Sequence, residues 1–266
     1  MYTNPQFVTQ STSTQVSEML HMQDNASSLT ERIKNRIDDT APFKRNELVP
    51  PFKHGKAKIM TAINYHLSAC LIRKVMSTTM EAIFCYLNNS TEFTRNNRTI
   101  STEVYENRFC HGKFGWPKNR DKKPNVLFVT VRHPIQRFVS GYVEKCMRKV
   151  RVMRTICFGC KDDLQCFIKN LYTALKEVYA GLDDKYESHK ITLSHFSPQS
   201  WNCLFYDHFD DYIMLHQGEN AESIAAYASE LDKVFKSVDV PSDRRKEICS
   251  QLLGKRMFAI NNLAVE

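Results

Sequence analysis

The sequence predicts an α/β fold in which helices flank a central, mainly parallel sheet. Two short apolar runs, 66–72 and 125–131, have the composition of strands that are covered on both faces. After each run, apolar residues recur at the spacing of a helix. Because strands that alternate with helices form parallel sheets, these observations together favour one sheet with helices on both sides.

The chain is expected to begin with a flexible segment and to continue as one domain. Residues 1–48 are rich in Ser, Thr, Asn and Gln, and only 28–36 suggests a short helix. Val49-Pro50-Pro51 then interrupts the chain. Residues 49–266 are long enough to bury a core of their own, so we predict a single folded domain there.

The first half of this domain contains the two strands. After 66–72 comes the polar loop 73–79, and then a helix whose buried face is marked by apolar residues from Met80 to Leu87. Residues 88–124 are basic and lack periodicity, which predicts an irregular excursion. Strand 125–131 ends at Arg132-His133-Pro134, and Pro134 suits the first turn of a helix that runs to about Lys149.

The second half is expected to be mostly helical. A helix is predicted over 164–178, a third strand over 211–216, and two further helices over 219–236 and 241–254. Pro241-Ser242-Asp243 has the composition of a helix start.

Charge limits the class of partner. The 266 residues carry a formal charge of +8, with a pI of about 9.0. This balance favours an anionic partner such as nucleotide phosphates, an acidic polysaccharide, nucleic acid or a membrane surface. A basic run at Arg148, Lys149, Arg151 and Arg154 fits either a solvated helix face or a track for an acidic sugar polymer.

Nine cysteines indicate an oxidising compartment. Cys146, Cys157, Cys160, Cys166 and Cys203 fall close together, and disulfides explain them better than buried free thiols do. A zinc site would require a second tight pair beside Cys157 and Cys160, so we expect no metal. An odd count leaves at least one thiol without a partner in the chain.

Glycosylation triplets point to the same compartment. They begin at Asn25, Asn88, Asn89 and Asn97. Residues 1–40 contain no apolar run that would serve as a signal peptide or membrane anchor. We therefore expect the sequence to lack its true start.

Two loops after strands have the character of phosphate sites. Segment 73–79 combines Lys74 with three hydroxyl residues at a helix N-terminus, although an ordinary capped helix start has the same composition. The second loop places Arg132 at a strand end and Ser140 two turns into the following helix. A guanidinium and a hydroxyl suit a phosphate monoester, whereas the alternative is an amphipathic helix with a surface arginine. Gly141 permits close approach of a ligand or of backbone.

These loops together resemble those of Golgi carbohydrate sulfotransferases. Lys74-Val75-Met76-Ser77-Thr78-Thr79 resembles their 5'-phosphosulfate loop, and 131–142 resembles their 3'-phosphate motif. Segments 157–167 and 194–203 are also similar to this family, in particular to its chondroitin 4-O- and HNK-1-type members. Two departures are the lack of glycine in the first loop and His133, where an acidic residue is usual.

The resemblance implies a P-loop-like sulfotransferase fold and a set of residue roles. Its donor would be 3'-phosphoadenylyl sulfate (PAPS), with no metal. Lys74 would stabilise charge at the 5' end of the donor, and Arg132 with Ser140 would bind its 3'-phosphate, assisted by Arg137 or Lys145. The remaining donor-binding residues would be Arg73, Ser77, Thr78 and Thr79.

A general base must accept the proton of the acceptor hydroxyl. His195 is the first candidate because it lies in a segment that the family shares, although a single histidine is more often structural. His111 and Glu106 are further candidates.

We therefore expect a PAPS-dependent carbohydrate sulfotransferase that acts on a glycosaminoglycan or other glycan and does not bind nucleic acid. The resemblance implies 4-O-sulfation of N-acetylgalactosamine in chondroitin, a Golgi location, a membrane anchor before residue 1 and an aromatic-rich segment after residue 266. The alternative is an inactive nucleotide- or polysaccharide-binding protein on the same fold. A P-loop kinase is excluded by the absence of a Walker A sequence.

Overall fold

The computed structural model describes residues 47–55, 57–110, 126–148 and 156–263, with side chains to residue 254. The chain divides into two compact units, Met1–Pro51 and Phe52–Glu266, and only the second is described in detail. The helix expected over 28–36 lies outside the described residues.

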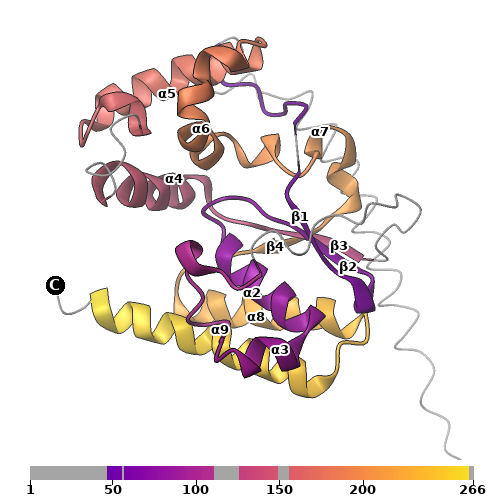
Figure 1. The fold of residues 1–266 in the computed structure, drawn as a ribbon. Coiled ribbons are helices and arrows are strands. Elements are labelled where there is room, and N and C mark those ends of the chain that lie inside the picture. The colour runs from indigo at the N-terminus through magenta and orange to yellow at the C-terminus, as the bar shows by residue number, and fades with distance from the viewer. Residues whose placement is uncertain (1–46, 56, 111–125, 149–155, 264–266) are drawn as a thin grey trace, which may run out of the picture. The chain divides into compact units, whose positions relative to one another are not determined.

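The sheet lies at the centre of the second unit (Figure 1). Its strand order is β1 (Ile59–Ala62), β2 (Leu67–Cys70), β3 (Val126–Val131) and β4 (Ile213–His216). Strands β2, β3 and β4 are parallel, whereas β1 pairs antiparallel with β2 at the edge. The predicted α/β class is confirmed, and β1 is an addition that the sequence pattern did not indicate.

One face of the sheet is covered by α2 (Ser77–Asn88), α8 (Ala221–Lys236) and α9 (Ser242–Leu263), with α3 (Ser90–Arg95) beside them (Figure 1). Phe84 of α2 and Phe235 of α8 pack on Phe128 of β3, with ring centroids 6.1 and 6.4 Å apart. All three rings are fully buried. This core explains why the apolar residues of α2 recur at helical spacing.

The other face is covered by α4 (Pro134–Tyr142), α5 (Leu164–Tyr179) and α6 (Lys190–Phe196), with α7 (Phe205–His208) further along the chain (Figure 1). Phe138, Phe167 and Phe196 form an aromatic cluster between these helices. A Cβ atom at Gly141 would lie 3.0 Å from the Phe196 ring. The close approach expected at Gly141 is therefore made by α6.

Most predicted elements match the structure within a few residues. The helix expected to reach Lys149 leaves α-helical geometry at Tyr142 and continues as a π-helical segment, Val143–Arg148. The described part of the expected irregular excursion, 88–110, contains α3 and a short 3₁₀ turn. The 3₁₀ turns are Ile63–Tyr65, Tyr105–Asn107, Ile156–Gly159, Asp183–His189, Gln199–Trp201 and Phe209–Asp211.

The cysteines form disulfides, as the sequence indicated. The pairs are Cys70–Cys203, Cys85–Cys110, Cys146–Cys157 and Cys160–Cys166, and Cys249 is free. Cys70–Cys203 joins the end of β2 to a segment far along the chain. In the described part of the chain, no cluster of His, Cys, Asp or Glu could hold a metal ion.

The structure gives a role in the fold to Asn88, which begins one of the glycosylation triplets. The Asn88 side chain donates to the carbonyl oxygens of Thr61 and Phe84, at 2.9 and 2.8 Å, and accepts from Ile63 N–H. These bonds tie α2 to β1, so Asn88 serves the fold. Asn97, by contrast, is exposed at the surface.

Candidate functional site

The two predicted phosphate loops meet at one cavity of about 220 Å³. Strands β2 and β3 are parallel neighbours, so the loops at their carboxyl ends lie at the same edge of the sheet. Most of the residues predicted for the site line this cavity: Arg73, Lys74, Ser77, Thr78, Thr79, Arg132, Ser140, Lys145 and His195. The structure thus brings together residues far apart in the sequence, and their binding and catalytic roles stay predictions.

The loop before α2 achieves its tight turn without glycine. Lys74 and Met76 both have left-handed backbone conformations, with φ of 66° and 51°. Such conformations cost about 1–3 kcal/mol each for a non-glycine residue and cluster at ligand-binding sites. Met76 is the N-cap of α2 and offers no side-chain hydrogen bond. The first N–H groups of α2 therefore lack a capping side chain, which suits them to an anion.

Lys74 is held by an acidic residue of the π-helical segment. One carboxylate oxygen of Glu144 accepts from Lys74 Nζ, and the other lies 2.8 Å from Lys145 Nζ. Burial would raise the pKa of Glu144, but hydrogen bonds from Lys145 and Lys74 lower it to about 2. Glu144 is therefore ionised at any physiological pH and bridges two lysines at the cavity.

Two consecutive residues of the π-helical segment share the cavity. Glu144 and Lys145 both line it, although neighbours on an α-helix diverge by about 100°. π-helical turns are rare and occur frequently at functional sites. Cys146, the residue after Lys145, forms the Cys146–Cys157 disulfide, which anchors the same segment.

Arg132 is fixed through its backbone as well as its side chain. Gln199 Oε1 accepts from Arg132 N–H at 3.0 Å, and Gln199 Nε2 donates to Arg132 C=O at 2.7 Å. The guanidinium donates from Nε and Nη2 to one oxygen of Glu219, both at 3.0 Å. The segment 194–203, noted in the sequence, thus positions the strand end that carries Arg132.

Arg137 is buried, and the expectation that it assists the 3'-phosphate stays a prediction. Its side chain donates to the carbonyl oxygens of Arg73 and Ser197, at 2.9 and 2.8 Å. Burial lowers its pKa to about 10. Arg137 is absent from the cavity lining, whereas Lys145 is part of it. Arg137 therefore joins the first loop to α6 and its following segment.

His195 is buried and neutral at physiological pH. Burial lowers its pKa to about 4, and the nearby charges of Lys145 and Arg73 act in the same direction. Nδ1 lies 2.6 Å from the carbonyl oxygen of Ile191, so Nδ1 carries the proton and Nε2 is left as an acceptor. A neutral imidazole whose Nε2 is an acceptor can take a proton, but a pKa of about 4 makes His195 a weaker base than a group whose pKa lies near physiological pH.

Three residues of the cavity were missed in the sequence: Tyr105, Glu144 and Gln217. Glu144 follows Ser140 by one helical turn, and this spacing was the available signal. Nothing local marks Tyr105 or Gln217, because a long excursion and a third strand end bring them to the cavity. Glu106 is exposed and outside the lining.

Two further expectations concern residues that the structure describes only in part. His111 lies outside the described residues, as do all members of the basic run except Arg148. Arg148 is exposed at the end of the π-helical segment.

A second cavity, of about 250 Å³, is lined by a different stripe of α6 and by residues such as Lys53, Trp201 and Tyr186. Lys53 pairs with Asp183 at 2.9 Å, and Lys190 pairs with Glu187. Its charges are thus balanced. The cavity at the strand ends has four lining cations, Arg73, Lys74, Arg132 and Lys145, against the single carboxylate Glu144. We therefore regard the strand-end cavity as the candidate active site.

Comparisons with known proteins agree with this geometry. A family model described as "Sulfotransferase family" matches residues 57–262. The carbohydrate sulfotransferase chst-1 of Caenorhabditis elegans is 29% identical over 239 residues, which cover 85% of this chain and 71% of that protein. The worm protein vep-2 is 29% identical over 244 residues, covering 87% of this chain and 74% of that protein. No solved structure gives a significant match.

Proposed function

Because the chain belongs to the sulfotransferase family, we propose that it transfers a sulfuryl group from PAPS to a hydroxyl of a glycan. Membership of this family implies PAPS as the sulfate donor. The carbohydrate sulfotransferase among its relatives supports a glycan as acceptor. We further propose that residues 49–266 act as one sulfotransferase domain, which the span of the family match supports.

The observation that carries the proposal is that Lys74 and Arg132 line one cavity from neighbouring strand ends. Both cations are paired with carboxylates, Glu144 and Glu219. A donor with anionic groups at both ends would replace these carboxylates. This arrangement fits a nucleotide that carries a 5'-phosphosulfate and a 3'-phosphate.

In the proposed complex, the two ends of PAPS are bound by different means. The N–H groups and hydroxyls of Ser77, Thr78 and Thr79 would hold the 5'-phosphosulfate, because an uncapped helix N-terminus stabilises negative charge. The Arg132 guanidinium and the Ser140 hydroxyl would bind the 3'-phosphate.

The transfer step is proposed as an in-line displacement. The acceptor oxygen forms a bond to sulfur while the bond from sulfur to the 5'-phosphate oxygen breaks, leaving adenosine 3',5'-bisphosphate. Lys74 stabilises the negative charge that develops on the leaving oxygen. His195 Nε2 takes the proton of the acceptor hydroxyl. Positioning and electrostatics supply most of the rate, as in phosphoryl transfer.

At finer detail, we propose chondroitin as the acceptor, with sulfation at the 4-hydroxyl of N-acetylgalactosamine. The cationic lining of the cavity supports an acidic polymer. We propose the Golgi lumen as the location, and four disulfides support an oxidising compartment. None of the helices in the described ranges is long and apolar enough to cross a bilayer.

A transfer assay tests the proposal. The full chain is incubated with PAPS labelled in its sulfate and with a panel of glycans that includes desulfated chondroitin. We expect label in chondroitin, and disaccharide analysis should place it at the 4-position. Lys74→Ala serves as the control for enzymatic transfer.

The same assay distinguishes an active sulfotransferase from the alternative, an inactive binding protein on the same fold. If no glycan accepts label while adenosine 3',5'-bisphosphate still raises the melting temperature, the chain is a binding protein and the proposed activity is wrong. Transfer to a glycan other than chondroitin would retain the activity and reject the finer proposal.

A further inference from the structure

Tyr105 presents an aromatic ring to the candidate active site. The ring lines the cavity together with Lys74 and His195, yet it is 50% exposed. Aromatic residues of this size usually bury most of their surface. Arg108 Cζ lies over the ring, 4.0 Å from its centre, so a ligand at the cavity would contact the remaining exposed surface of the ring.

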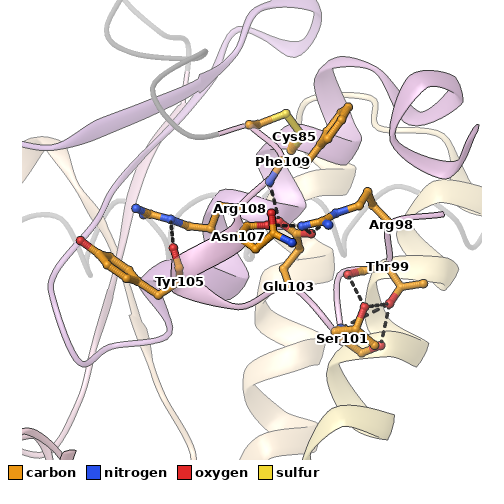
Figure 2. Close-up of polar contacts among 11 residues, drawn as sticks. Cys85, Arg98, Thr99, Ser101, Glu103, Tyr105, Asn107, Arg108 and Phe109 are labelled. Carbon is orange, nitrogen blue, oxygen red and sulfur yellow. Dashed lines mark hydrogen bonds and ion pairs between the residues drawn. A yellow bond between two sulfur atoms is a disulfide. The ribbon is translucent and has the colours of Figure 1, made fainter. Parts of the chain in front are cut away.

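The loop that carries Tyr105 is held by a polar network (Figure 2). Buried Glu103 accepts from Arg98 Nε at 2.5 Å and from Phe109 N–H at 3.0 Å. Arg108 Nε donates to the Tyr105 carbonyl oxygen at 2.9 Å. These contacts fold the loop on itself and fix the backbone of Tyr105.

Two ties join this loop to α2, whose first turn lines the cavity. Arg108 forms an ion pair with Glu81, a buried residue of α2. The Cys85–Cys110 disulfide joins the end of the same loop to α2 one turn later (Figure 2). These two ties therefore fix the position of Tyr105 relative to the phosphate loop.

Tyr105 lies at the reacting end of the cavity. Its hydroxyl hydrogen-bonds the Arg73 side chain, and this bond is the main cause of a lowered pKa for the phenol. Lys145 Nζ lies 5.9 Å from the centre of the ring. Glu144 pairs with both Lys145 and Lys74, and the charges of Arg73 and Lys145 both lower the pKa of His195. Arg132, in contrast, is paired with Glu219.

We propose that Tyr105 is the platform on which the acceptor sugar ring stacks, and that Arg73, predicted from the sequence to bind the donor, instead binds an anionic group of the acceptor. The inference rests on the proposed sulfotransferase function. The C–H face of a pyranose is apolar and suits an aromatic face, while its hydroxyls remain free to face His195. A guanidinium beside the ring suits a carboxylate because it donates two parallel hydrogen bonds.

The ring is tested by separating acceptor binding from donor binding. Tyr105→Ala should raise the acceptor KM for desulfated chondroitin by about tenfold, as truncation of an aromatic anchor commonly does. Affinity for adenosine 3',5'-bisphosphate, measured by calorimetry, should stay within about twofold of the wild type. Tyr105→Phe keeps the ring and should give a smaller rise. Tyr172→Ala, an exposed tyrosine of α5 outside the cavity, is the matched control.

Two outcomes would overturn the platform. Weaker binding of adenosine 3',5'-bisphosphate with an unchanged acceptor KM would mean that the ring stacks on the nucleotide. An unchanged acceptor KM together with unchanged nucleotide affinity would mean that the ring contacts neither. Melting temperatures equal to that of the wild type would show that the variants are folded.

The role of Arg73 is tested with a matched pair of acceptors. Chondroitin and its carboxyl-reduced form differ only in the carboxylate, so the wild type should prefer the former, and Arg73→Gln should lose this preference. A preference that survives the substitution would reject Arg73 as the anion contact.

Failure of the proposed function has a different signature. If the wild type transfers no sulfate, direct binding of desulfated chondroitin in the presence of adenosine 3',5'-bisphosphate still tests Tyr105. Equal binding by the wild type and Tyr105→Ala would then reject the platform independently of turnover.

Discussion

Lys74 and Arg132 both place a cation at the cavity, but the surrounding structure positions the two side chains in different ways. Lys74 lies in a loop whose own backbone is strained, with left-handed conformations at Lys74 and Met76, and its charge is coupled to Glu144 and Lys145. Arg132 lies at a regular strand end, and a distant side chain, Gln199, fixes its backbone. Its carboxylate partner, Glu219, comes from the loop before α8.

This difference suggests a division of labour. The Lys74 site combines the open N-terminus of α2 with a lysine in a partly buried ionic network, which suits it to stabilise charge that develops during reaction. The Arg132 site is a preorganised guanidinium, which suits recognition of a fixed anion. We therefore expect Lys74 to govern kcat and Arg132 to govern donor affinity.

The largest expected effect separates the two sites directly. Lys74→Ala should lower kcat by about 10²- to 10³-fold, as does loss of one group that stabilises transition-state charge. Arg132→Ala should raise the donor KM by about tenfold to a hundredfold, since a charge-assisted hydrogen bond is lost, with a smaller change in kcat. Steady-state kinetics with PAPS varied measures both. Equal losses of kcat in the two variants would contradict the division.

A second effect concerns the base on the Lys74 side. His195→Asn should lower kcat at pH 7 by about 10²-fold, because the acceptor nitrogen Nε2 is lost. Asparagine can still donate to the Ile191 carbonyl oxygen, so the fold around α6 should be retained. Kinetics and the melting temperature are measured on the same preparation. Wild-type kcat in a folded variant would assign proton transfer to another group.

A smaller effect is expected on the Arg132 side, where the substitution should increase nucleotide affinity instead of reducing activity. Glu219→Gln should tighten binding of adenosine 3',5'-bisphosphate by up to about fivefold, because a partly exposed carboxylate no longer competes for Arg132. Titration calorimetry measures the change. Glu222→Gln, an exposed acidic residue in the first turn of α8, controls for the loss of one negative charge. Weaker binding in Glu219→Gln would show that Glu219 positions Arg132 instead.

The smallest effect is a change in the pH dependence of stability. Folded His195 has a pKa of about 4, below its ordinary 6.5, because burial disfavours the charged imidazole. Between these values the unfolded chain binds more protons, so the free energy of unfolding should fall as pH drops from 6.5 toward 4. His195→Asn should make this fall shallower. Denaturant melts across the window measure it, and parallel curves for both proteins would contradict the buried neutral state.

The site could be predicted to a large extent because its donor loops are local features. Lys74, Arg132 and Ser140 each follow a strand at a fixed spacing, and parallel strands bring such loops to one edge. The edge strand β1 was missed because four buried residues, Ile59–Ala62, carry no alternation that distinguishes a strand from a loop. Helix α6 was missed because its 7 residues, Lys190–Phe196, are too few to establish a helical period.

The sequence by itself determined the α/β class, the two loops that follow β2 and β3 to the cavity, the helix that carries Ser140 and the use of cysteines in disulfides. These depend on periodicity, helix ends and composition, which short segments encode. Only the tertiary structure decided which cysteines pair, as in Cys70–Cys203, and which carboxylates meet Lys74 and Arg132. It alone placed Tyr105 at the cavity. Such contacts join segments far apart in the chain, so their geometry is set by the packing of the whole domain.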